Sequence, residues 1–174
     1  ELQDGGRVRM CVGGRNSTDQ SFAAGMVFGQ RVFVCDNLAL SGEFTFKRKH
    51  TAHIMQDLPG LISQGFERYF VEKVNAAKIV ERFQNAHISD RAAKAAIHDA
   101  CAAGVAGWTK APLIYREYKS PTFEHEAPDT VWMLQQAVTQ IHKSYNIMTA
   151  ADRSLKLHTQ LVRAFAPDLM TASN

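Results

Sequence analysis

The sequence predicts a single α+β domain over residues 1–174, in which a small antiparallel sheet of three or more strands comes first. A long helix is expected to pack on that sheet, with further helices after it. Two patterns predict this class. Up to residue 48, short apolar stretches alternate with polar residues, as in half-buried strands, and from Thr51 apolar residues recur at spacings of three and four, as on a helix.

The sheet is predicted over about residues 7–48. Its first strand alternates from Val8 to Val12 and is expected to end at Gly13. The apolar run that follows is either one strand with a bulge or two strands joined by a tight turn near Gly29. Both alternatives leave a further alternating strand immediately before the first helix.

Helices are predicted over about residues 51–104 and 129–166, where apolar stripes have the helical period. Pro59 leaves two alternatives open, a kinked helix or a second helix that starts there. A polar pair, Ser89-Asp90, is expected to cap another helix. Residues 105–128 contain three prolines and few periodic positions, so an irregular connection is predicted there.

Charge and composition exclude several classes of protein. The formal net charge is +3 and the pI about 8.8, below the value of about 9 that marks a nucleic-acid binder on total charge alone. No apolar run reaches the roughly 20 residues of a membrane span, and no secretory signal is evident. The three cysteines, Cys11, Cys35 and Cys101, form no CxxC pair and are interpreted as structural thiols in a reducing compartment.

A cluster of basic residues at the junction between the last strand and the first helix is the strongest functional candidate. Together with cations and amides from the preceding strands and loops, it is expected to line a groove between the sheet and the long helix and to bind phosphates. The alternative is that the lysines are merely solvated at a strand end. The predicted nucleic-acid-binding residues are Arg15, Asn16, Arg31, Asn37, Lys47, Arg48, Lys49 and His50.

Catalytic and metal chemistry have weaker support. His50 and His53 would share one helix face and could hold a metal ion with Cys35 or Asp36, but this spacing is common by chance. Cys35, His50 and Asp36 supply the residue types of a nucleophilic site without any known signature around them. The sequence therefore predicts no catalytic residue, no metal and no cofactor, and it favours a protein that is not an enzyme.

Three closely spaced blocks carry a resemblance to a known family. The blocks GRNSTD (14–19), GQRVFVCDNLALSGE (29–43) and KRKHT (47–51), with TVWMLQQAVTQIHK (130–143) downstream, resemble phage- and plasmid-borne domains of unknown function. That resemblance covers most of the chain. It implies a protein of a mobile element, located in the cytoplasm of a bacterial host, and it assigns no activity.

The predicted order of elements is also similar to that of phage single-strand annealing proteins of the RecT and Red-beta kind. This weaker likeness implies a basic groove for single-stranded DNA and a homo-oligomeric ring or filament, but fold-level analogy does not establish function. The favoured interpretation is a non-enzymatic nucleic-acid-binding protein that binds or anneals single-stranded DNA, with no membrane partner. The alternatives are a protein-interaction or anti-host factor that uses its late helices as the contact surface, and a metal-dependent enzyme.

Overall fold

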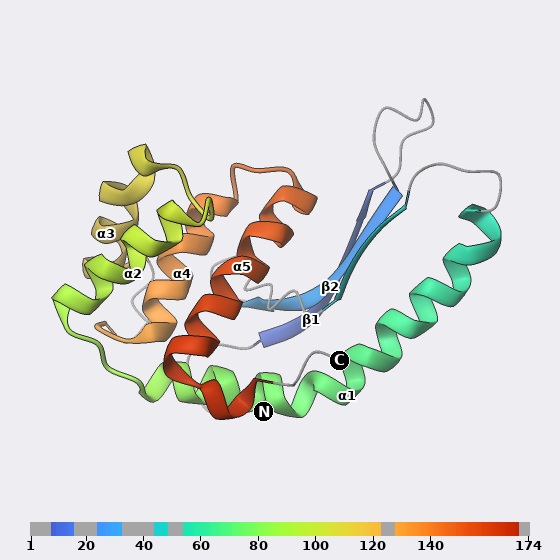
Figure 1. Ribbon diagram of the computed structural model, residues 1–174, viewed down its shortest axis with the longest axis horizontal. Coiled ribbons are helices and arrows are strands. Elements are labelled where there is room, and N and C mark those ends of the chain that lie inside the picture. The colour runs from blue at the N-terminus through green and yellow to red at the C-terminus, as the bar shows by residue number, and fades with distance from the viewer. Residues whose placement is uncertain (1–7, 16–23, 33–43, 49–53, 123–127, 171–174) are drawn as a thin grey trace.

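The computed structural model describes residues 8–15, 24–32, 44–48, 54–122 and 128–170 (Figure 1). The strands are β1 (Val8–Arg15), β2 (Ala24–Val32) and β3 (Phe44–Arg48). The helices are α1 (Ile54–Asn85), α2 (Asp90–Ala102), α3 (Ala111–Lys119), α4 (Val131–His142) and α5 (Ile147–Phe165), with 3-10 turns η1 (Trp108–Lys110) and η2 (Pro167–Leu169).

The predicted α+β class is wrong for the part of the molecule that forms the described core. The residues whose side chains the structure describes (56–67, 77–122, 128–146 and 149–170) are 79% helical and contain no strand or sheet, so this part is all-helical. Its buried side chains come from the helices and their connections, among them Phe83, Ile97, Ile114 and Leu161. The helices bury their apolar stripes against one another, which removes the need for a sheet as the central layer.

Helix α4 lies at the centre of this helical body. Every residue from Val131 to Thr139 is buried, and α1, α3 and α5 all pack against the helix. A helix that is buried on all sides has no polar face, and this explains why its sequence is apolar or uncharged nearly throughout. Its first turn is closed by the Thr130 hydroxyl, which accepts a hydrogen bond from the Met133 backbone N–H at 3.1 Å.

Helix α1 is one continuous helix that contains Pro59, so the alternative of a second helix starting at that proline is wrong. Pro59 lies only five residues after the first helical residue, Ile54, and its missing N–H removes one hydrogen bond near the helix start. At the beginning of α2, Ser89 is the capping residue, and its hydroxyl accepts from the Ala92 N–H at 3.2 Å. Asp90 is therefore the first helical residue of α2 and not its cap.

The prediction of an irregular connection over 105–128 is wrong, because α3 and η1 lie within it. Pro112 is in the first turn of α3, where a missing N–H costs nothing. Ile114 and Tyr118, four residues apart, are both fully buried and fix the helix against α4. These two residues are the helical signal that the prolines obscured.

The three strands form an antiparallel sheet in the order β1-β2-β3. Strand β2 runs without interruption through Gly29 and Gln30, so the alternative of a tight turn there is wrong. Strand β1 likewise continues past Gly13 to Arg15. Helix α1 packs along β2 and β3, and α5 packs against β1 and β2 (Figure 1).

Candidate functional site

The register of the sheet places four cationic residues on one face. Residues that pair directly across antiparallel strands share a face, and residues an even number apart along a strand do too. Arg15 pairs with Gly25 and Gly25 pairs with Lys47, so the three form one row across the sheet. Arg31 is six residues beyond Gly25 on β2 and pairs with Arg9. We call Arg9, Arg15, Arg31 and Lys47 the basic face.

The opposite face has most of the apolar positions of the strands, including Met10, Phe28, Phe44 and Phe46, whereas Cys11 and Val27 share the basic face. Arg48 pairs with Ala24 and therefore belongs to this second face. The predicted cluster at the strand-to-helix junction is thus divided, because Lys47 and Arg48 are neighbours in sequence and occupy opposite faces. The shared face of Arg15, Arg31 and Lys47 depends on strand register, which adjacency in the sequence does not determine.

The spacing of the basic face follows from standard strand geometry. Neighbouring strands lie about 4.8 Å apart, so the backbones of Arg15 and Lys47 are about 10 Å apart on either side of Gly25. Six residues along β2 separate this row from the Arg9–Arg31 row, a distance of about 20 Å. The basic face therefore has cations at both ends of the sheet, with positions such as Gly29 between them.

Half of the predicted site cannot be placed. Asn16, Asn37, Lys49 and His50 lie outside the described residues. The alternative metal ligands His53, Cys35 and Asp36 lie outside them as well. In the parts of the chain that the structure does describe, no three histidine, cysteine or acidic side chains are grouped so as to hold a metal ion.

Arg9 is the residue that sequence reasoning missed. Arg9 and Arg15 are six residues apart, and residues an even number apart on one strand lie on the same face. The two arginines therefore share a face only if one strand continues through both. Ending the strand at Gly13 separated the two arginines. The alternation of Arg9 with apolar neighbours contained the signal, but only the full length of β1 links it to Arg15.

The helical body contains a buried histidine that joins three segments. The Nε2 atom of His142, on α4, lies 3.0 Å from the carbonyl oxygen of Val105, and its Nδ1 atom lies 2.9 Å from the hydroxyl of Ser154 on α5. A carbonyl oxygen only accepts, so Nε2 carries the proton and Nδ1 accepts from Ser154. Burial, opposed by the Val105 hydrogen bond and assisted by the Arg153 cation, lowers the pKa of His142 to about 4.

A second buried histidine lies one helical turn beyond Ser154. His158 is 8% exposed, and its ring centroid is 6.1 Å from that of Phe83 on α1. Burial lowers its pKa to about 4, and its Nδ1 atom has no hydrogen-bond partner among the described residues. Neither His142 nor His158 was predicted as a functional residue, because each occupies an apolar helical stripe and has no motif around it.

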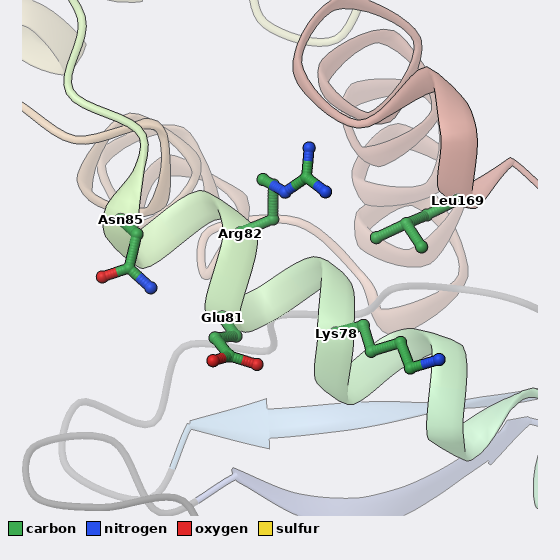
Figure 2. A pocket seen from close by; sticks show the side chains of 5 residues that line it. All are labelled: Lys78, Glu81, Arg82, Asn85 and Leu169. Atoms are coloured by element: carbon green, nitrogen blue, oxygen red, sulfur yellow. The ribbon is translucent and has the colours of Figure 1, made fainter.

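An open cavity of about 320 Å³ lies between the C-terminal half of α1 and η2, lined by Lys78, Glu81, Arg82, Asn85 and Leu169 (Figure 2). Arg82 forms an ion pair with Asp168 at 3.2 Å, and both side chains are about half exposed. The charges around the cavity are mixed, with two cations near two carboxylates. This arrangement gives no preference for an anionic or a cationic ligand.

The late helices, which the protein-interaction alternative takes as its contact surface, differ in exposure: little of α4 is exposed, whereas α5 has exposed residues such as Lys156, Thr159 and Arg163. Helix α4 is buried almost throughout, and half of α5 faces the core. The exposed large apolar side chains of the described residues are Trp108 in η1 at 56%, Met170 at 41% and Leu113 in α3 at 38%. The ring of Trp108 meets that of His98 edge-on at 5.0 Å.

Comparison with known proteins adds no family or fold relationship. No protein-family model matches the chain, and no curated protein or solved structure is significantly similar to it. Over the residues that the structure describes, no helix is long and apolar enough to span a membrane. The resemblances to phage and plasmid proteins therefore stay predictions, and function has to be argued from the residues themselves.

Proposed function

We propose that this protein binds nucleic acid through the basic face, with single-stranded DNA as the favoured ligand and without catalysing a reaction. The observation that carries the proposal is the strand register, which gives Arg9, Arg15, Arg31 and Lys47 one face in common. Three of these four residues were also predicted from the sequence. The proposal does not depend on the four predicted residues that lie outside the described chain.

The charge of this face supports a polyanionic ligand. Lysine and arginine are almost never fully buried unless they are paired, so four of them on one face require solvent, carboxylates of the protein or an external anion. Nucleic-acid phosphates would neutralise these charges and release condensed counterions, and the affinity would then decrease with salt. Rows of cations about 20 Å apart suit an extended chain of phosphates better than one small anion.

The test compares two neighbouring cations that occupy opposite faces. Lys47→Ala removes a charge from the basic face, and Arg48→Ala removes an equal charge from the other face at the next position. Binding of a fluorescent oligothymidine is measured by anisotropy between about 50 and 200 mM salt. We expect Lys47→Ala to weaken binding and to reduce the salt slope by about 0.7, the value for one phosphate contact on a single strand, while Arg48→Ala leaves both unchanged.

Equal effects of the two substitutions would contradict binding through one face, and salt-independent binding would contradict phosphate recognition altogether. A duplex of the same length, bound as tightly as the single strand, would retain nucleic-acid binding and remove the preference for single strands. Light scattering tests the ring or filament that the annealing-protein likeness implies. A large assembly favours annealing, whereas a monomer limits the function to binding.

A protein-interaction function is the second candidate, and the exposed side chain of Trp108 favours it. Tryptophan is enriched among the residues that dominate binding energy at protein interfaces. A pull-down from a bacterial lysate, compared with a Trp108→Ala control, tests this function. One stoichiometric protein that is lost in the control, with no nucleic acid, would favour it over the basic face.

A further inference from the structure

We propose that α5 is held in place by two neutral histidines, His142 and His158, and that acid releases this helix from α4 and α1. The proposal concerns the helical body and is independent of the proposed nucleic-acid binding. Three residues on two helices form the latch: His142 on α4, and Ser154 and His158 on α5. Ser154 and His158 are four residues apart, so they share one face of α5.

The first half of the latch is the His142 ring, which joins α4 to α5 and to the turn after α2. Both of its nitrogen atoms are engaged, one with the Val105 carbonyl and one with the Ser154 hydroxyl. This pattern is complete only for the neutral ring, in which Nδ1 is an acceptor. A second proton makes Nδ1 a donor, so the Ser154 hydroxyl has to turn and the ring gains a buried positive charge.

The second half of the latch is the His158 ring, which packs against Phe83 of α1. Its Nδ1 atom has no hydrogen-bond partner among the described residues. A protonated ring would therefore present a charged donor to an apolar wall, which is costly unless the helix moves and admits water. Protonation of the two histidines therefore places two positive charges against the same buried face of α5, one at Ser154 and one at His158.

The charged groups around the latch do not compensate these protons. Arg153 is the described charge that acts on His142, and its guanidinium lies 4.3 Å from the ring centre of Tyr145, whose own ring centre is 5.7 Å from that of His142. On η2, Asp168 is ion-paired with Arg82 of α1 at the surface. Among the described residues, no charged group acts on His158. His142 has a cation nearby, and no carboxylate among the described residues acts on His158. A proton gained by either ring is therefore not balanced by a negative charge.

The direction of the pH effect follows from the lowered pKa values. Both histidines have pKa values of about 4 in the folded chain, against the ordinary histidine value of 6.5. The released state therefore takes up protons more readily than the folded state. The stabilisation by the neutral rings is fully present above about pH 6.5 and is lost as the pH falls toward 4.

The chain carries its own reporter for the test. It has two tryptophans, of which Trp132 is buried on α4 and Trp108 is exposed. In a Trp108→Phe background, Trp132 fluorescence is followed from pH 7 to 3.5, and hydrogen exchange is measured helix by helix at the same pH values. We expect a red shift of Trp132 and a rise of exchange in α5 before α2 and α3.

The decisive variant is His142→Gln with His158→Phe, which removes both titrating rings and keeps a donor for the Val105 carbonyl. The proton uptake linked to release should fall by about two, and the transition should move to lower pH. His87→Gln with His98→Gln, at two exposed histidines, is the matched control and should leave the transition unchanged. An unchanged transition in the decisive variant, or simultaneous exchange of all helices, would overturn the latch.

A second measurement keeps the proposal testable if the double variant does not fold. Histidine ring signals of the unchanged protein are titrated by NMR. Two rings that remain neutral well below pH 6 until α5 opens support the latch. Titration of all seven histidines near 6.5 in the folded protein would refute it.

Discussion

Thr130 offers the sharpest test of how the helical body is built. It is fully buried, it precedes the central helix α4, and its hydroxyl accepts from the Met133 N–H at 3.1 Å. Thr130→Ala leaves that N–H without this partner in an environment that water does not reach. The cost of losing a helix cap is about 0.5–2 kcal/mol, and burial of the donor favours the upper half of this range.

Thr130→Ser is the matched control, because serine keeps the accepting oxygen and loses only the γ-methyl group. Both variants lack that methyl, so the difference between their free energies of unfolding isolates the contribution of the hydroxyl, the cap included. We expect Thr130→Ala to be less stable than Thr130→Ser by about 1–2 kcal/mol in urea titrations. Equal stability of the two variants would refute the cap and with it the account of how α4 begins.

Three further predictions concern the same body, each read from urea denaturation. Phe83→Ala should cost about 3–5 kcal/mol, because the side chain is fully buried in the core and leaves a cavity; a loss below 1 kcal/mol would contradict that packing. Gly104→Ala should cost about 1 kcal/mol, since Gly104 has φ +72°, whereas Gly60→Ala, inside α1 with open space around it, should stabilise by about 0.5–1 kcal/mol. Arg82→Ala should have almost no effect, as its ion pair with Asp168 is exposed, and a large loss would indicate a role beyond that pair.

The helices could be predicted from local chemistry alone, and the fold class could not. The cap at Ser89 and the apolar stripe before it are properties of neighbouring residues, and α1 and α2 follow from them. Local sequence does not determine which helix packs its apolar stripe against which other helix or sheet. Alternating residues before position 48 suggested that a sheet was the central layer, whereas the described core is formed by helices around α4.

Helix α3 shows that the helix-breaking effect of proline depends on where in the helix the proline lies. Prolines break helix interiors, but Pro112 lies in the first turn, where its missing N–H is no loss. Ile114 and Tyr118, four residues apart and both buried, are the helical signal in this segment, and the sequence interpretation did not use it because it counted the prolines and few periodic positions.

The candidate site depended on information that a sequence holds only in part. Adjacency suggested that Lys47 and Arg48 act together, but in a strand adjacent residues occupy opposite faces. The row of Arg15 with Lys47 requires the pairing of both with Gly25, which is set by register between distant segments. The sequence therefore showed which cationic residues were candidates for binding, but it did not show which of them lie together on one face of the sheet.

The nearly complete burial of α4 has a consequence for synthesis of the chain. During translation α4 leaves the ribosome before α5, one of the helices that cover it, so an apolar surface is exposed for as long as the next twenty or so residues take to emerge. A nascent chain that pauses near Ile147 would present α4 to chaperones or to other copies of itself. The core around α4 can therefore be completed only when α5 has emerged, and chains that stall before that point are the ones at risk of aggregation.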